Sequence, residues 1–316
     1  MPIVRHADLV ALDRVLKGAF MGSYESPNYK PKWPMWAGFQ NSTSKKNTYP
    51  MVLDPASIRE WTEGERSYNG IVIEGANVTN QLWELSYEIP RVEYEDDATG
   101  VTRQAVSQVK SGAAKYLRHP DKLCTNVLVN NSTCFDGLAL FHASHKVNPA
   151  DPASSTVSNT DTGALTANNA ASARKALLEV PTSEGDAAND AEKLALLVPP
   201  ALELTARKIA QADIVIHTAT ATDTAESNVY RGMYDVIVLP RLGAAFSGSD
   251  SYWYMVDVTD PEDRAVIFQE RQKVEMVSMF SPSDPAAFEL DRFRWGTRAR
   301  YTAAAANWHK IVRRTG

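Results

Sequence analysis

The stretch QLWELSYEIPRVEYEDDATGVTRQAVSQVKSGAAKYL, residues 81–117, changes its hydrophobic period part-way along. Between 82 and 89, Trp83, Leu85, Tyr87 and Ile89 alternate with polar or smaller residues, which is typical of a strand. After acidic residues 95–97, apolar residues fall on one helical face: Val101, Ala105, Val109, Ala113, Tyr116 and Leu117. The sequence therefore predicts a strand followed by a long helix, with acids before its first turn and Pro120 breaking or restarting it.

The residues before this stretch extend the strand prediction. Residues 71–74 also show a period of two, and the sequence EGAN, residues 74–77, separates them from 81–89. We expect the two runs to form one long two-stranded ribbon. Because an isolated ribbon is only marginally stable in water, it is expected to need a partner surface.

The N-terminal region predicts a helix followed by an arm. Residues 1–20 carry apolar side chains at helical spacing: Leu9, Leu12, Leu16 and Phe20. Residues 21–50 show no period and are rich in Pro, Tyr, Trp, Ser and Asn. Trp33, Trp36 and Phe39 are costly to leave in water, so this segment is expected to lie along another surface, such as a neighbouring subunit.

Downstream, helices and strands alternate as in a mixed α/β domain. Residues 167–180 and 201–211 predict helices, whereas 193–200 and 228–243 predict strands, and strands dominate from 252 to the end.

The composition, 44% hydrophobic and 22% charged over 316 residues, is that of a globular protein. The net charge of −5 argues against a dedicated nucleic-acid binder. Two cysteines are too few for a disulfide framework, and neither a signal peptide nor a membrane span is expected.

The motif CFDGLALFHASHKV, residues 134–147, holds residue types found in metal sites and in nucleophilic catalysis. Cys134, Asp136, His142 and His145 would be the groups of a zinc site or of a Cys–His enzyme. However, there is no close cysteine pair, and no glutamate lies between the two histidines. A buried turn at Asp136–Gly137 with core residues around it is the better interpretation, so no catalytic, cofactor or metal residue is expected.

The C-terminal stretch is strongly basic. From residue 292 onward the chain carries no Asp or Glu, but it does carry Arg292, Arg294, Arg298, Arg300, Lys310, Arg313 and Arg314. Such a patch could lie near phosphate or could pair with the acidic ribbon of an adjacent subunit.

Several of these segments, in this order, carry a resemblance to a known family. They are REWTEGERSYNGIVIEG (59–75), YEIPRVEYEDDATG (87–100), KYLRHPDKLCTNVLVN (115–130), the pattern of Cys134, Asp136, Gly137, Phe141, His145 and Val147, and VSNTDTGALT (157–166). From about Arg59 to the end, the chain resembles the major head subunit of Mu-like bacteriophages, whose shells use the HK97-type capsid fold. The N-terminal arm departs from that pattern.

The resemblance implies an α+β architecture with five parts. These are an N-terminal helix and arm (1–50), an extended β-ribbon loop (51–97), a spine helix of the peripheral domain (98–128), an α/β axial domain (129–250) and return strands of the peripheral domain (251–316). In this fold the arm and the loop reach over neighbouring subunits. Aromatic residues and Arg commonly anchor interfaces, so the expected inter-subunit contacts are Trp33, Trp36, Phe39, Trp83, Tyr87, Ile89 and Arg91.

The implied function is that of a phage major capsid protein, not an enzyme, that self-assembles into an icosahedral head around double-stranded DNA. Its implied partners are copies of itself in hexamers and pentamers, the packaged DNA, a separate scaffold protein, a portal and a decoration protein, with no membrane. It would be assembled in the bacterial cytoplasm and reside in the virion. The alternatives are an encapsulin-like cellular compartment and a cytosolic enzyme using Cys134 with His142 or His145, or a metal there.

Overall fold

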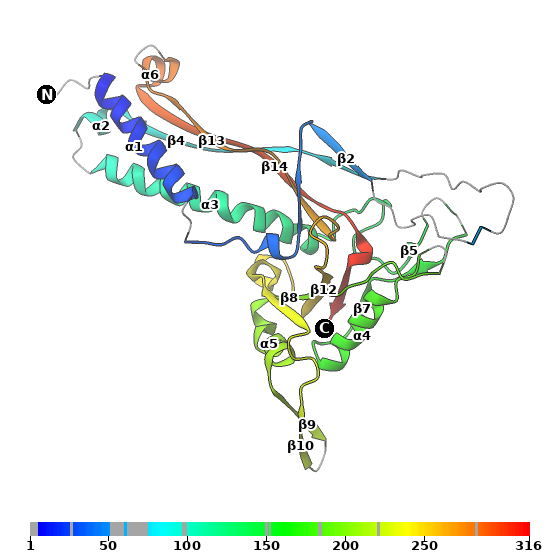
Figure 1. Cartoon of the computed structure of the whole chain (residues 1–316). Coiled ribbons are helices and arrows are strands. Elements are labelled where there is room, and N and C mark those ends of the chain that lie inside the picture. Colours follow the sequence, from blue (N-terminus) through cyan, green and yellow to red (C-terminus); the bar gives the residue numbers. More distant parts are fainter. Residues whose placement is uncertain are drawn as a thin grey trace.

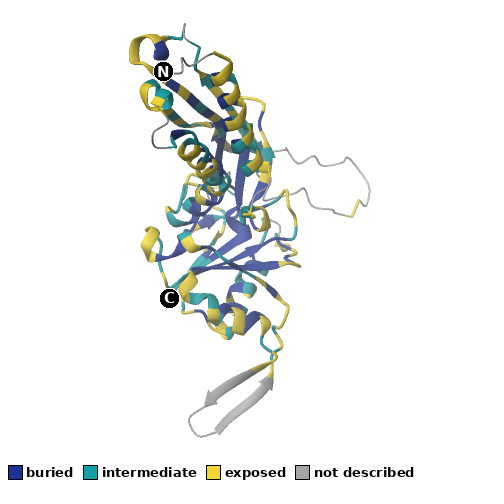
Figure 2. Cartoon of the chain, turned by 90° about the vertical axis from the view of Figure 1, so that its left-hand side faces the viewer, coloured by how far each residue is buried: buried dark blue, intermediate teal, exposed yellow. Residues whose placement is uncertain are grey.

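The computed structural model describes residues 6–25, 28–50, 60–61, 75–96, 100–148, 151, 153–182, 185–219, 222–281 and 284–316. Its two largest sheets organise the chain (Figure 1). A four-stranded sheet with two long helices forms the upper part of that view, and a five-stranded sheet with its own helices forms the lower part. One hydrophobic core is continuous between them, as the buried residues in Figure 2 show.

The four-stranded sheet has the order β1-β13-β14-β4. Its central strand β14 pairs antiparallel with both β13 and β4, and β1 runs parallel to β13. Alternate side chains of β14 are buried, with the period of two that strand geometry dictates. The bounds of its strands are β1 (Gly38–Asn41), β4 (Gln81–Pro90), β13 (Val266–Met279) and β14 (Arg292–Ala305), and α6 (Pro285–Leu290) lies between β13 and β14.

Helices α1 (His6–Glu25) and α3 (Val101–Val129) pack against the buried face of this sheet. The predicted apolar stripe of α1 is confirmed, since its four residues are all buried. The prediction that Pro120 interrupts the second helix is wrong, because α3 runs through it without a break. Proline removes one backbone donor, but the next residue, Asp121, fastens the helix to the segment before β1, and this tertiary packing outweighs the local preference.

The predicted ribbon over 71–89 is described only in part. β3 (Gly75–Thr79) pairs with β2 (Lys46–Pro50), and β4 pairs with β14 instead of with β3. Residues 71–74 lie outside the described part of the chain. Residues 75–77 of the EGAN segment thus belong to β3, and β3 and β4 each pair with a strand that is distant in sequence.

The five-stranded sheet has the order β11-β8-β12-β15-β7. Helices α4 (Ala167–Leu178) and α5 (Glu203–Gln211) share a core with one face of β8, and the other face of β8 joins the core of the four-stranded sheet. This burial on both faces explains why the sequence of β8 is uniformly apolar. The strands are β7 (Thr160–Thr162), β8 (Leu194–Val198), β11 (Tyr234–Val238), β12 (Tyr252–Asp257) and β15 (Ile311–Thr315).

The return of residues 251–316 to the peripheral part remains a prediction, because the strands of this range are divided between the two sheets. β13 and β14 belong to the four-stranded sheet, whereas β12 and β15 belong to the five-stranded one.

Among helices of the described residues, none combines the length and apolar character that crossing a bilayer requires. The remaining elements are α2 (Arg91–Asp96), β5 (His145–Lys146), β6 (Thr156–Val157), β9 (Ile214–Ala219), β10 (Thr222–Ser227) and the short 3-10 turns η1 (Trp33–Met35), η2 (Pro200–Leu202), η3 (Pro240–Leu242), η4 (Ala244–Phe246) and η5 (Trp308–Lys310).

Candidate assembly surfaces and the 134–147 motif

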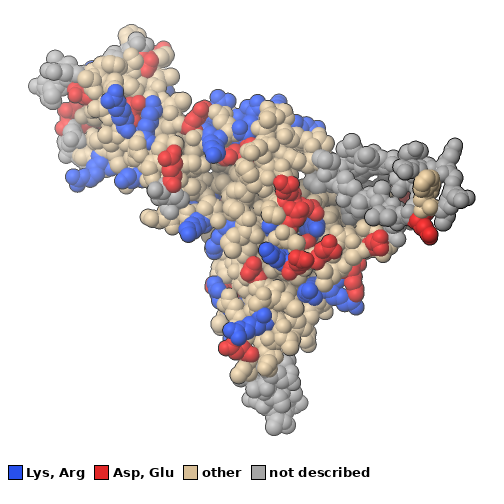
Figure 3. All heavy atoms as spheres, viewed as in Figure 1, with Lys and Arg blue, Asp and Glu red and all other residues tan. Residues whose placement is uncertain are grey.

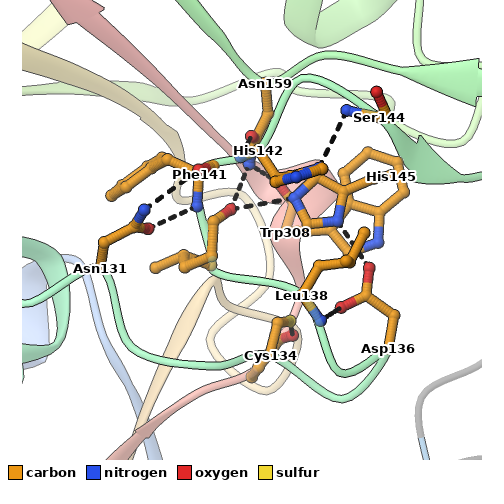
Figure 4. Close-up of polar contacts among 12 residues, drawn as sticks. Asn131, Cys134, Asp136, Leu138, Phe141, His142, Ser144, His145, Asn159 and Trp308 are labelled. Atoms are coloured by element: carbon orange, nitrogen blue, oxygen red, sulfur yellow. Dashed lines mark hydrogen bonds and ion pairs between the residues drawn. The ribbon is translucent and has the colours of Figure 1, made fainter.

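His145 lies at the centre of the 134–147 motif and is completely buried (Figure 4). Its Nδ1 lies 2.6 Å from Asp136 Oδ2, and its Nε2 lies 3.3 Å from the carbonyl oxygen of Leu140. Its ring stacks on Trp308 of η5, with the ring centroids 4.5 Å apart and the planes nearly parallel. Both ring nitrogens and one ring face are therefore used within the chain.

The other polar groups of the motif are satisfied in the same way. Asp136 Oδ1 accepts from the backbone N–H of Leu138 across the turn at Gly137, which has the positive φ that glycine tolerates. Asn131 exchanges two hydrogen bonds with the backbone of Phe141. The network thus ties the C-terminal end of α3 to the loop that follows it.

Asn159 extends this network towards the C-terminal part of the chain. Its side chain accepts from the N–H of His142 and donates to the carbonyl oxygens of Leu140 and Trp308. It is buried, so these bonds replace the water that its amide would otherwise contact.

Cys134 is buried, and its thiol donates to the carbonyl oxygen of Ala306 at 2.7 Å. Burial, followed by the charge of Asp136, raises the pKa of the Cys134 thiol to about 12. A nucleophilic cysteine needs the opposite shift, because the thiolate is the reactive form. Among the described residues, no group of three or more His, Cys, Asp and Glu side chains is placed to hold a metal ion. The motif is therefore built as a structural turn.

Most of the residues predicted as inter-subunit contacts are buried or partly buried by their own chain. Trp36 and Ile89 are buried, so neither offers a surface to a neighbour in this conformation. Trp83 is partly buried, and its Nε1–H donates to the carbonyl oxygen of Tyr301. Tyr87 approaches Gly112 of α3 so closely that the helix has no room for a side chain there.

The arm segment likewise packs on its own chain. Trp33 is partly buried, and its ring lies 4.7 Å from that of Phe268 in β13. Phe39 is 43% exposed on the edge strand β1. Arg91 is also half-exposed and pairs with Glu95 and Asp291. Of the seven predicted contacts, Phe39 and Arg91 are the two that present substantial surface.

Comparison with known proteins places this architecture in a family. The model for the family described as "Phage capsid protein" matches residues 93–313, and that for "Mu-like prophage major head subunit gpT" matches residues 9–164. The chain belongs to the phage capsid protein family. The resemblance to Mu-like head subunits that the motifs indicate is confirmed.

Curated relatives agree with this assignment. The major capsid protein of Escherichia phage Mu is 29% identical over 150 residues, which is 46% of this chain and 47% of the relative. The Mu-like prophage FluMu major head subunit of Haemophilus influenzae is 29% identical over 108 residues, which is 34% of each chain. The chain thus matches about half, or less, of the length of these relatives.

Solved structures show the fold. The procapsid of bacteriophage JBD30 matches with a TM-score of 0.56 at 20% identity, covering 99% of this chain and 76% of that one. The mature capsid of bacteriophage PhiM1 matches with a TM-score of 0.53 at 14% identity, covering 91% and 87%. The predicted HK97-type α+β fold is confirmed.

The basic C-terminal stretch of this capsid-family chain is partly paired within the subunit. Arg292 and Arg294 of β14 both pair with Glu88 of the neighbouring strand β4, and Arg314 pairs with Asp161 of β7. Figure 3 shows the result on one face, where positive and negative side chains are interspersed over the described surface. Glu88, which belongs to the segment expected to form the acidic ribbon, thus pairs with this stretch within the same chain.

One exposed apolar feature was missed from the sequence. Phe288 of α6 is 86% exposed, and Leu290, Val277 and Met279 nearby in β13 and α6 are each at least 42% exposed. These residues lie at the tip of the four-stranded sheet (Figure 1). The sequence around Phe288 has no period that separates an exposed apolar residue from a core residue.

Proposed function

We propose that this chain is the major head subunit of a Mu-like phage and assembles with copies of itself into an icosahedral shell around double-stranded DNA. The observation that supports this most strongly is the capsid-family match over residues 93–313, which covers most of both sheets. A shell is built by repeating modest interfaces, and symmetry closes it.

The exposed apolar residues support an assembling role for the subunit. Large apolar side chains that remain in water commonly mark protein–protein contact sites. Phe39 lies on an edge strand, and Phe288 lies at the far tip of the same sheet. Interfaces at both places would connect one subunit to more than one neighbour, as a closed shell requires.

The finer parts of the proposal concern partners and place. Hexamers and pentamers of the chain would form the shell, with a separate scaffold protein, a portal and a decoration protein as further partners. Assembly would take place in the cytoplasm of the bacterial host, and the finished subunit would be a virion component. A structural, non-catalytic role fits the motif at 134–147, whose reactive groups already bond within the chain.

The first test is light scattering and negative-stain microscopy of the purified full-length chain. We expect shells, tubes or rings of capsomers. A monomer carrying stoichiometric zinc would contradict the proposal and would favour the enzyme alternative instead.

Two variants then locate the contacts. Phe39→Ser and Arg91→Gln should lower the melting temperature only slightly and should assemble poorly, because both side chains are half-exposed. Trp83→Asp is the comparison variant. It should lower the melting temperature itself, since the ring packs against the core and bonds Tyr301. Normal assembly of both exposed variants would remove these two residues from the interface.

A further inference from the structure

A cavity of about 700 Å³ lies between α3, the segment that precedes β1, and the turns η3 and η4. Five cationic side chains line it: Lys32, Lys115, Arg118, Lys122 and Arg241. One carboxylate, that of Asp121, lies among them. The whole chain carries a net charge of −5, so this cluster opposes the sign of the molecule.

The single carboxylate does not neutralise the cluster. Asp121 accepts from the hydroxyl of Tyr29 and from the backbone N–H groups of Lys32 and Trp33. Lys32 Nζ donates to the carbonyl oxygen of Val238. Within the described ranges, none of the five cations forms an ion pair with a carboxylate.

The two guanidinium groups are held in place by aromatic rings. Arg118 lies 5.2 Å from the ring centroid of Tyr29, and Arg241 lies 5.2 Å from that of Phe246. Stacking on a ring fixes the plane of a guanidinium and leaves its N–H edge free to donate. Arg241 Nε is buried and has no hydrogen-bond partner. Arg174, Arg264 and Arg314 also have an Nε of this kind outside the cavity, so it is the cation cluster and the two stacked guanidinium groups that mark the cavity.

His119 also lines this cavity. Burial, followed by the charges of Lys122 and Arg241, lowers the pKa of His119 to about 4. Its Nδ1 lies 2.9 Å from the hydroxyl of Tyr301, and a neutral imidazole can accept that hydrogen bond.

We propose that this cavity binds a ligand through its phosphate groups, with Arg118 and Arg241 donating from their guanidinium edges and the lysines supplying charge. Phosphate fits better than a single carboxylate, because each group offers several oxygens to several unpaired cations. The phosphate can belong to the backbone of double-stranded DNA or to a free polyphosphate. Only the choice of DNA rests on the proposed function.

The binding test uses the purified full-length chain in low-salt buffer without phosphate, with inorganic tripolyphosphate as the titrant in calorimetry. The double variant Arg118→Gln/Arg241→Gln should raise the Kd at least tenfold. Arg103→Gln/Lys110→Gln is the matched control, since it removes two exposed cations from α3 outside the cavity. Equal affinity of the cavity variant and this control would overturn the proposal.

A second variant guards against a folding defect. Lys115→Gln/Lys122→Gln keeps both stacked guanidinium groups and should still weaken tripolyphosphate binding by several-fold. Circular dichroism must show that both cavity variants retain a melting temperature close to that of the wild type. Wild-type affinity in a folded Lys115→Gln/Lys122→Gln variant would also count against the proposal.

Two competitors identify the source of the phosphate. If a 20-base-pair duplex displaces tripolyphosphate, the site takes backbone phosphate. In that case a plot of the logarithm of the duplex association constant against the logarithm of salt concentration should have a slope smaller in magnitude by about two in the double variant. If the duplex fails to displace it, the site takes a free polyphosphate. Tighter binding of poly-glutamate than of either would overturn the proposal in favour of an acidic protein segment. Microscopy of shells is a separate measurement, so failure of assembly and failure of binding are distinguishable.

Discussion

The 134–147 motif and the cavity beside α3 use reactive or charged side chains in opposite ways. In the motif, Asp136 and His145 are buried and each finds its partners within the chain. In the cavity, Arg118 and Arg241 lie near solvent-accessible space and pair with no carboxylate among the described residues. The difference teaches that residue type alone does not mark a binding site. The balance of donors and acceptors around the residues does.

The largest effect should come from breaking the buried pair of the motif. Asp136→Ala leaves His145 buried without its partner, and we expect a loss of about 3 kcal/mol in the free energy of unfolding. Urea denaturation followed by circular dichroism measures it. The control is Asp190→Ala at an exposed carboxylate, which should change stability by less than about 0.5 kcal/mol. Equal stability of the two variants would show that the pair contributes nothing.

A smaller loss should follow from Asp121→Ala at the edge of the cavity. This carboxylate holds Tyr29 and two backbone N–H groups of the segment before β1. Leaving those donors without an acceptor should cost about 2–3 kcal/mol and should speed proteolysis of residues 28–33. Asp121→Asn keeps one acceptor oxygen, so its stability and its proteolysis rate should lie between those of the wild type and those of Asp121→Ala. A proteolysis rate equal to that of wild type would mean that other contacts hold the segment.

The pH dependence of stability tests the positive potential of the cavity. The pKa of His119 is lowered to about 4 in the folded chain, against about 6.5 when unfolded. Between these values the unfolded chain binds more protons, so stability is full above about pH 6.5 and falls as the pH drops towards 4. Because the ring is only partly buried, we expect His119 to account for about 1 kcal/mol of this loss.

His119→Gln should reduce that slope in melting temperature between pH 7 and pH 5 without abolishing it. Burial also lowers the pKa of His309 to about 4, so the second histidine keeps part of the dependence. An unchanged slope in the variant would show that His119 titrates normally.

A similarly small effect on stability should come from the cavity cations. Arg118→Gln/Arg241→Gln should lower the free energy of unfolding by about 1 kcal/mol without ligand, since two cation–π contacts are lost but neither group holds a carboxylate that would be left alone. Urea denaturation checks this value. A loss comparable to that of Asp136→Ala would mean that these arginines are structural and would erase the contrast between the two regions.

Local patterns in the sequence predicted the elements well. The stripe of α1, the uniformly apolar β8 and the helices α4 and α5 each follow from spacing within one segment. Strand β4 was also predicted as a strand. Its partner was not, because the choice between a neighbouring run and β14, some 200 residues away, depends on packing that no local period records.

The candidate site shows the same limit more sharply. The cations of the cavity come from three distant segments, at residue 32, residues 115–122 and residue 241, so no cluster is visible in the sequence. The visible cluster after residue 292 is partly paired in the fold, with Glu88, Asp161 and, for Lys310, Asp257 and Asp263. Strand register decides which of these charges meet, and the sequence does not record that register.

Strand β14 has a mechanical consequence. It is hydrogen-bonded along both edges, to β13 and to β4, and after η5 the chain continues directly as β15 of the other sheet. A force along β14 acts on many of these backbone hydrogen bonds at once and parallel to the strands, so we expect the strand to resist extension. The turn at η5 is itself well held, because Lys310 pairs with Asp257 and Asp263 and Asn307 donates to Asp263. Tension applied at the α6 tip would therefore pass along β14 and through this buried turn to the five-stranded sheet.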